Sequence, residues 1–280
     1  MEFNAIFSPV DENSISDNKF NRKSSLGNTI TIHTPEKKIP ELSDFDICLF
    51  SVNEDRNALQ KGCINGGTRV RNILYKLENH FENLKMIDIG ILKTGKTISD
   101  TYVIIRDIII ELLYNNVIPV IIGGSHDLTY AVYQGYEKAE KTVSVSAIDP
   151  KIDLGNAEED FHSESYISKI IFDKSRYLFN FSNLAYQSYY LSKDNLEKTE
   201  KLYFDAYRLG SLRSNIKLAE PVLRDSHILS IDLKSIRTSD APAQQLFSPN
   251  GLYGEEICQL CKYAGISNKL STFGIFEYTP

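Results

Sequence analysis

The 280-residue chain lacks the features that mark a membrane protein or a nucleic-acid-binding protein. No apolar run approaches the roughly 20 residues that a membrane-spanning helix needs, and the first residues lack the basic flank and apolar core of a signal peptide. The formal net charge is -6, and lysine and arginine are not clustered into a strip that would neutralise phosphates. We therefore expect a cytoplasmic protein with a small-molecule substrate or ligand and no nucleic-acid or membrane partner.

Cysteine is also scarce, with four residues in the chain. Cys48 lies in an apolar run and Cys63 in a polar loop, so no disulfide framework is expected. Cys258 and Cys261 are three residues apart in a helical pattern. They could form a redox pair or be two small apolar residues on a buried helix face. Their mid-helix position favours the second interpretation, since it is the N-terminus of a helix that lowers the pKa of a thiol.

The chain does have the apolar material for one large α/β domain, because 42% of its residues are hydrophobic and 24% are charged. Residues 1–44 are polar and predict an N-terminal arm laid over the domain, which would span residues 45–280. No repeat or low-complexity tract interrupts that domain.

Apolar runs that predict strands alternate with patterns that predict helices over residues 45–280. The expected strands are 45–51, 84–90, 118–122, 143–149, 177–181, 201–205, 228–232 and 272–277. The expected helices are 68–77, one that Ser99 or Asp100 caps and that runs to about 113, 128–136 and 255–263. This alternation predicts a mainly parallel sheet with helices on both faces.

Polar side chains follow four of the predicted strands. They are His126, Asp149 with Asp153, Asp232 and Glu277. Each one alone could merely cap a turn or a helix. Because ligands bind beyond the carboxyl ends of parallel strands, their coincidence at four strands favours one shared site. One imidazole and three carboxylates form a suitable set of ligands for a divalent ion such as manganese.

Four segments resemble, in order, the motifs of the ureohydrolases, which include arginase, agmatinase and formimidoylglutamase. They are Gly123-Gly-Ser-His-Asp127, Asp149-Pro-Lys-Ile-Asp153, Ser230-Ile-Asp-Leu-Lys234 and Phe276-Glu-Tyr-Thr-Pro280. The resemblance spans about residues 45–280. It implies a three-layer α/β/α sandwich of about eight mainly parallel strands, often in a homo-oligomer. It also implies two manganese ions that activate a hydroxide against a guanidinium or amidine carbon. The closing helix that follows the last motif in that family is not expected here.

The resemblance assigns metal ligands position by position. His126, Asp149, Asp153 and Asp232 match the ligands of the family's first metal ion. The second ion would share Asp149 and Asp232 but would also need a histidine and an aspartate at positions that here hold Lys151 and Lys234. A protonated lysine has no lone pair with which to bind a metal ion. We therefore expect at most one manganese ion, with the two lysines replacing the second.

The resemblance also implies roles in catalysis and substrate binding. Asp149, Asp232 and Glu277 would be catalytic, and Glu277 would face the cationic nitrogen of the substrate. Asn156 and His162 would contact the other end of the substrate. Two hypotheses follow: a hydrolase of linear C–N bonds in amidine or guanidino compounds, formimidoylglutamase- or arginase-like, or an inactive pseudoenzyme with a binding or regulatory role. A thiol-redox role through the cysteine pair is a third hypothesis.

Overall fold

The computed structural model describes residues 2–11, 22–81, 83–155, 159–173 and 176–279, and one mixed sheet organises them. Its strands run in the order β1-β4-β3-β5-β10-β9-β6-β7-β8, and β2 also pairs with β4. The strands are β1 (Phe7–Ser8), β2 (Thr31–Ile32), β3 (Ile47–Val52), β4 (Met86–Leu92), β5 (Ile118–Ile122), β6 (Val143–Ile148), β7 (Leu178–Tyr186), β8 (Asp205–Arg208), β9 (Ile228–Asp232) and β10 (Thr272–Phe276). Apart from the antiparallel pair β1 and β4, the pairs among these strands are parallel, which confirms the predicted sheet.

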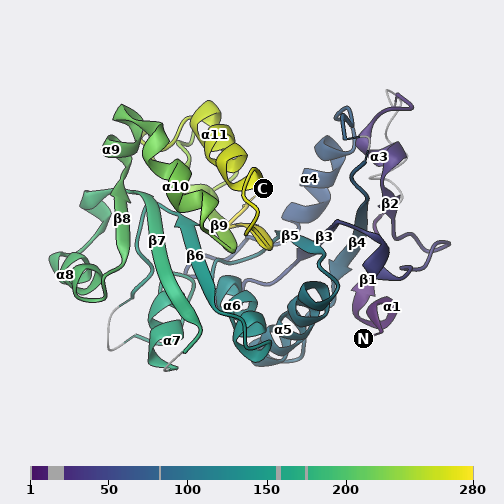
Figure 1. Ribbon diagram of the computed structural model, residues 1–280, viewed down its shortest axis with the longest axis horizontal. Helices are drawn as coiled ribbons and strands as arrows, with labels where there is room; N and C mark the ends of the chain where they lie inside the picture. The colour runs from purple at the N-terminus through teal and green to yellow at the C-terminus, as the bar shows by residue number, and fades with distance from the viewer. Residues whose placement is uncertain (1, 12–21, 82, 156–158, 174–175, 280) are drawn as a thin grey trace.

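Helices cover the two faces of the sheet, so the expected three-layer α/β/α fold is confirmed (Figure 1). In the view of Figure 1, α5 (Ile98–Tyr114), α6 (Leu128–Lys138) and α7 (Tyr166–Phe172) lie below the sheet. Above it lie α4 (Gly66–Leu74), α9 (Leu209–Ser214), α10 (Ala219–Arg224) and α11 (Gly254–Gly265). The remaining helices are α1 (Phe3–Ile6), α3 (Leu26–Thr29) and α8 (Lys193–Lys201), with 3₁₀ turns at η1 (Leu42–Asp44), η2 (Ser188–Tyr190), η3 (Ile216–Leu218) and η4 (Leu233–Ser235). No helix among the described residues is long and apolar enough to cross a membrane.

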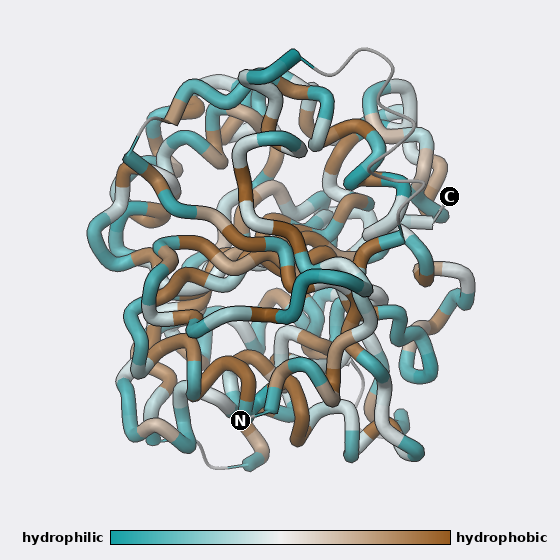
Figure 2. Tube along the Cα trace, turned by 90° about the vertical axis from the view of Figure 1, so that its right-hand side faces the viewer, coloured by the Kyte–Doolittle hydropathy of each residue, from teal (hydrophilic) through white to brown (hydrophobic). Residues whose placement is uncertain are grey.

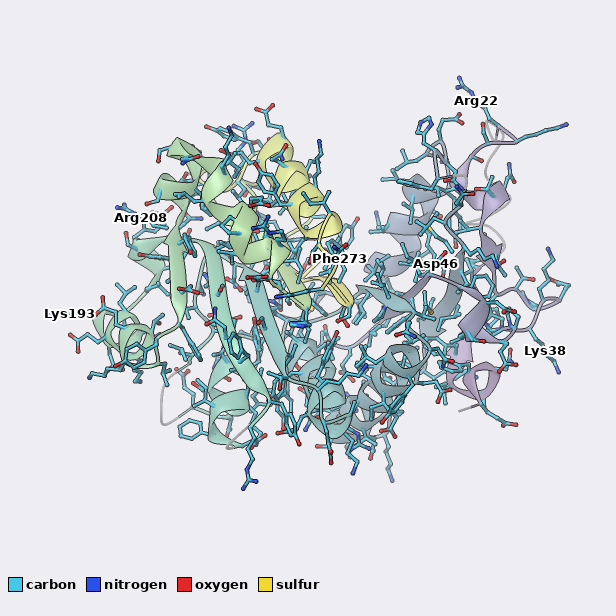
Figure 3. All side chains as sticks on the ribbon, viewed as in Figure 1. Arg22, Lys38, Asp46, Lys193, Arg208 and Phe273 are labelled. Atoms are coloured by element: carbon cyan, nitrogen blue, oxygen red, sulfur yellow. The ribbon has the colours of Figure 1, made fainter. Side chains whose placement is uncertain are left out.

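The core lies on both faces of the central strands, as the concentration of hydrophobic segments through the middle of Figure 2 shows. All five residues of β9 are buried, including the charged Asp232 at its end. In Figure 3, Phe273 of β10 lies in the middle of the molecule. The labelled Lys193 and Arg208 lie at the β8 end of the sheet. The interior strands thus bury apolar side chains along their length and bring polar ones to their ends.

The described part of the N-terminal 44 residues contributes two short strands, so that the sheet has ten strands among the described residues and not about eight. β1 pairs with β4 through Phe7 and Leu92, and β2 pairs with β4 through Thr31 and Ile87. Phe7 and His33 are buried. The division into an arm and a domain stays a prediction, but the described part of this segment packs on the sheet edge.

Several predicted boundaries differ from the structure: β7, predicted at 177–181, continues to Tyr186, and α4, predicted at 68–77, ends at Leu74. The cap of α5 is Thr97, whose side chain accepts a hydrogen bond from the Asp100 backbone N–H, while the Asp100 carboxylate accepts one from the Thr97 N–H. Asp100 therefore belongs to a capping box and is not itself the cap. The strand expected at 201–205 begins only at Asp205, because α8 runs to Lys201 and Tyr203 then takes a left-handed turn (φ 57°).

A buried ion pair fixes α4 against β3 and β4. The Arg71 guanidinium donates to both carboxylate oxygens of Asp88, at 2.7 and 2.8 Å, and to Ser51 Oγ at 2.8 Å. Tyr75 Oη also donates to Asp88, at 2.8 Å. Arg71 and Asp88 are almost fully buried, so each compensates a charge that would otherwise be costly to bury.

Replacing one member of this pair should destabilise the fold. We expect Arg71→Met to lower the free energy of unfolding by about 3–5 kcal/mol, because it leaves the Asp88 carboxylate buried without a cation. Urea denaturation measures the loss. The double variant Arg71→Met with Asp88→Leu removes both charges and should lose clearly less than the single variant. Equal losses in the two variants would show that charge compensation is not the cause.

Candidate metal centre

The predicted site residues meet because the four strands that carry them are neighbours in the sheet, in the order β5-β10-β9-β6. The strands are parallel and end at one level, with Ile275 opposite Ile122, Phe276 opposite Asp232 and Ile148 opposite Ile231. The polar residues that follow these strands therefore share one edge of the sheet, as the sequence predicted.

The loop after β5 is held by close backbone contacts that need glycine. A Cβ added at Gly124 would overlap the carbonyl oxygen of Glu54. The same carbonyl accepts a hydrogen bond from Ser125 N–H at 2.9 Å, and Gly124 O accepts one from Glu277 N–H at 2.8 Å. The His126 N–H donates to Glu277 Oε1 at 2.9 Å. These contacts fix the backbone from which the imidazole projects.

Three buried side chains converge in the manner of metal ligands. His126 Nδ1 lies 3.0 Å from Asp149 Oδ2 and 3.1 Å from Asp153 Oδ2. Their potential ligand atoms all lie within 4.8 Å of one another. None of the three atoms has a hydrogen-bond partner, although each is buried. Since buried polar atoms are normally paired, one imidazole nitrogen and two carboxylate oxygens that converge without hydrogen-bond partners fit a bound divalent cation.

The far side of the imidazole is held as metal-binding histidines usually are. His126 Nε2 lies 2.8 Å from Ser230 Oγ, which in turn lies 2.6 Å from Thr129 Oγ1. A proton on Nε2, donated to Ser230, leaves the Nδ1 lone pair facing the carboxylates. The rings of Tyr166 and Phe276 lie 4.8 and 5.5 Å from the imidazole and fix its orientation. Sequence reasoning did not assign this role to Ser230.

Without a cation the cluster is electrostatically strained. Burial and the neighbouring Asp149 charge raise the pKa of Asp153 well above its ordinary value. Burial alone would lower the pKa of His126, but its contacts with Asp149 and Asp153 raise it overall. Burial would likewise raise the pKa of Asp149, but His126 lowers it overall. These opposed shifts arise because two buried carboxylates share a single cationic neighbour.

Asp232 lies on the same Nδ1 side of the imidazole, and Lys234 lies next to it. Asp232 Oδ2 is 3.9 Å from His126 Nδ1, and burial raises the pKa of Asp232 to about 7. Lys234 Nζ lies 3.0 Å from Glu277 Oε2 and 3.7 Å from Asp232 Oδ2. Burial would lower the pKa of Lys234, but Asp232 and Glu277 raise it overall, so the ammonium stays protonated. The structure thus brings Asp232, Lys234 and Glu277 together beside the possible ligand group.

Lys151 has a different nearest partner from Lys234. Its ammonium is paired with Glu164, at 2.7 and 2.6 Å from the two carboxylate oxygens. Its backbone N–H donates to Asp149 Oδ1 at 2.7 Å. Glu164 also lies 4.0 Å from Lys234 Nζ, so it serves both lysines. Sequence reasoning missed Glu164 because it lies outside every motif, although it is only two residues from His162.

His162 lies in a loop near the ligand group. Its Nε2 is 3.1 Å from Glu159 Oε2, and its Nδ1 accepts a hydrogen bond from the Glu164 N–H at 3.1 Å. The loop lines a cavity of about 550 Å³ that Asp153 and Lys151 also line. The other residue predicted to bind substrate, Asn156, lies outside the described residues.

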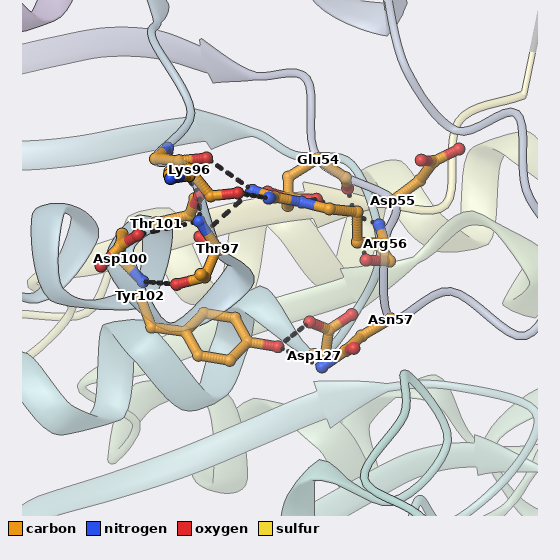
Figure 4. Close-up of polar contacts among 12 residues, drawn as sticks. Glu54, Asp55, Arg56, Asn57, Lys96, Thr97, Asp100, Thr101, Tyr102 and Asp127 are labelled. Atoms are coloured by element: carbon orange, nitrogen blue, oxygen red, sulfur yellow. Dashed lines mark hydrogen bonds and ion pairs between the residues drawn. The ribbon is translucent and has the colours of Figure 1, made fainter.

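A second polar network, also missed from the sequence, braces the loop after β3 against α5 (Figure 4). Arg56 Nε donates to Glu54 Oε1 at 2.9 Å, and the Arg56 guanidinium also donates to the Lys96 carbonyl. Tyr102 Oη donates to the Asp127 carboxylate in the His126 loop. Burial would raise the pKa of Glu54, but hydrogen bonds from Arg56 lower it overall. The network positions the Glu54 carbonyl, which holds that loop.

The cysteine pair on α11 shows no sign of an activated thiol. Cys258 and Cys261 are both free, Cys258 being exposed and Cys261 half-buried. Burial raises the pKa of Cys261 to about 11, whereas a redox-active thiol needs a lowered pKa.

Comparison with known proteins agrees with this geometry. The model of the Arginase family matches residues 45–280. The formimidoylglutamase of Bacillus subtilis (strain 168) is 24% identical over 175 residues, which are 58% of this chain and 54% of that protein. The chain therefore aligns with only about half the length of this relative. The formimidoylglutamase of Streptococcus gordonii (strain Challis) is 22% identical over 236 residues, which are 78% of this chain and 71% of that protein.

Solved structures share the fold. A crystal structure of Trypanosoma cruzi formiminoglutamase with Mn²⁺ has a TM-score of 0.76 at 21% identity and covers 85% of this chain and 86% of its own. The structure of formimidoylglutamase from Bacillus subtilis has a TM-score of 0.77 at 16% identity and covers 96% and 91%. Because the family model matches residues 45–280, which include strands β3 to β10 and the polar residues at their ends, the chain belongs to the arginase family.

Proposed function

We propose that the chain is a manganese-dependent hydrolase of linear C–N bonds in amidine or guanidino compounds, working with a single ion. The observation that carries the proposal is the convergence of His126 Nδ1, Asp149 Oδ2 and Asp153 Oδ2 as buried atoms without hydrogen-bond partners. The formimidoylglutamase relatives support the reaction class, and the Mn²⁺ bound to the Trypanosoma cruzi formiminoglutamase supports the choice of metal.

The residues of the site would have two roles, metal binding and proton transfer. His126, Asp149 and Asp153 would hold the ion, with Asp232 as the adjacent carboxylate. A bound divalent ion supplies Lewis acidity, which lowers the pKa of water and makes hydroxide available near neutral pH. Asp232 Oδ2 lies 3.9 Å from His126 Nδ1. We assign Asp232 the role of the base that takes the proton from the attacking water and passes it to the leaving nitrogen. Burial of these residues strengthens their electrostatic interactions.

Lys234 would replace the second ion of the family. Its buried ammonium contacts Asp232 and Glu277 and approaches Glu164, so one positive charge serves three carboxylates. Both oxygens of Glu277 are engaged, Oε1 by the His126 N–H and Oε2 by Lys234. Glu277 would therefore hold Lys234 in place. Lys151, which pairs with Glu164, would support this arrangement from the rim of the cavity.

The contact between Lys234 and Glu277 also favours a second candidate function, a binding or regulatory protein without catalysis. Glu277 is the residue expected to face the cationic nitrogen of a substrate, and an internal cation already lies 3.0 Å from it. In this alternative the ammonium groups of Lys151 and Lys234 would compensate the carboxylates of the pocket at all times, whether or not a ligand is bound. A homo-oligomer, a cytoplasmic location and a small-molecule partner, with no nucleic-acid or membrane partner, belong to both proposals.

Metal content and turnover decide between the two functions. We expect one manganese ion per chain after dialysis, measured by elemental analysis, and hydrolysis of arginine, agmatine or formimidoylglutamate in added manganese. Asp153→Asn should lose the ion and lower kcat/KM at least about 100-fold, because it removes one ligand. Asp225→Asn changes an exposed acid that pairs with Lys269 and should leave both readouts unchanged. A chain that holds no metal and turns over none of the three compounds would contradict the hydrolase.

The charge of Lys234 can be tested by removing it. We expect Lys234→Met to lower the free energy of unfolding by about 3 kcal/mol, because Glu277 and Asp232 then stay buried without their cation. Thermal or urea denaturation without metal measures the loss. Lys269→Met removes an exposed lysine and should cost less than about 1 kcal/mol. Equal losses in the two variants would show that Lys234 does not compensate the buried carboxylates.

The double variant Lys151→His with Lys234→Asp rebuilds the ligand set of the second ion. We expect its manganese content to rise from one to two ions per chain, since a lone-pair donor and a carboxylate replace two ammonium groups. An unchanged content of one ion would show that the lysines do not occupy the place of the second ion.

A further inference from the structure

A cavity of about 550 Å³ opens beside the candidate metal centre, and its lining has a distinct chemistry. Asp153 lines it, is 3% exposed and carries an oxygen without a hydrogen-bond partner. The cavity therefore reaches the group where a reacting carbon would lie. Its opposite wall comes from the η2 turn and the start of α8, through Tyr190, Leu191 and Asn195.

The walls of the cavity suit a short aliphatic chain. Apolar side chains contribute Leu59, Ile152, Phe161 and Leu191, and the ring of Tyr190 adds to them. Methylene groups gain free energy when they leave water for such a surface. A ligand with several methylene groups between its reacting carbon and its far end would bury them here.

Some charged side chains of the lining form ion pairs and others do not. The Lys151 ammonium is paired with Glu164, and His162 contacts Glu159. Asp160 is exposed and makes no hydrogen bond or ion pair among the residues that the structure describes. The described lining thus carries four carboxylates, those of Asp153, Glu159, Asp160 and Glu164, against the ammonium of Lys151 and the imidazole of His162. This excess of acidic groups favours an ammonium over a carboxylate at the end of a ligand.

We propose that this cavity selects the tail of the substrate and prefers an aliphatic primary amine to a carboxylate, with Asp160 as the residue that determines specificity. The preference rests on the proposed hydrolase function for the reacting end of the substrate. It distinguishes amine-tailed guanidino compounds from the amino-acid-tailed and dicarboxylate-tailed ones.

Turnover tests the preference directly. With manganese added, we expect kcat/KM to be at least about tenfold higher for agmatine than for arginine, which has the same chain with a carboxylate added, and higher than for formimidoylglutamate. Asp160→Asn should lower kcat/KM for agmatine about fivefold through KM, the size expected for one exposed ion pair. Asp160→Lys should reverse the order of agmatine and arginine. Asp225→Asn, the matched removal of an acid that does not line the cavity, should change neither value.

Binding separates this proposal from the proposed function. Calorimetry measures 1,4-diaminobutane and glutamate against the full chain, with no reaction required. Binding of the diamine that is weakened by Asp160→Asn, in a chain that turns over none of the substrates, would uphold the amine site and overturn the hydrolase. Turnover that favours formimidoylglutamate or arginine would overturn the amine preference and uphold the hydrolase. The preference is also overturned if glutamate binds more tightly than the diamine, or if the diamine does not bind.

Discussion

Charge compensation among buried carboxylates is the constraint on which the polar edge of this sheet depends. Asp149, Asp153, Asp232 and Glu277 are each 2–3% exposed, and such groups are expensive to bury unless a cation lies near them. Among the residues that the structure describes, Lys234 is the cation that contacts Asp232 and Glu277. Asp149 and Asp153 contact the His126 imidazole instead. A bound divalent ion would compensate that second pair.

The same constraint explains why the surroundings of the site are rigid. The His126 loop is packed against the Glu54 carbonyl so closely that Gly124 has no room for a side chain. Arg56 and Tyr102 then hold the two sides of this contact through Glu54 and Asp127. Ligands that converge on one point need such fixed backbones, because a displacement of about 1 Å would separate the ligand atoms.

Replacement of a metal ion by a lysine changes what a pocket of this kind can do. An ammonium compensates negative charge and donates hydrogen bonds, but it lacks the Lewis acidity of a metal ion. Lys234 preserves the electrostatic balance of the edge where β9 and β10 end while leaving the reaction to a single ion. Glu164 extends this balance to Lys151, so the two lysines and the carboxylates of Glu164, Asp232 and Glu277 form a connected group, of which Lys151 and Glu164 line the cavity.

The sequence by itself determined the parallel sheet, its helical layers and the strand ends that carry His126, Asp149, Asp153, Asp232 and Glu277, because these follow from local apolar patterns and motif order. Only the tertiary structure decided which side chains contact one another at the site. It turned Lys151 towards Glu164 and Lys234 towards Glu277, set Ser230 behind the imidazole, and added β1 and β2 to the sheet edge. These contacts join residues far apart in the chain and depend on side-chain direction, which no local pattern encodes.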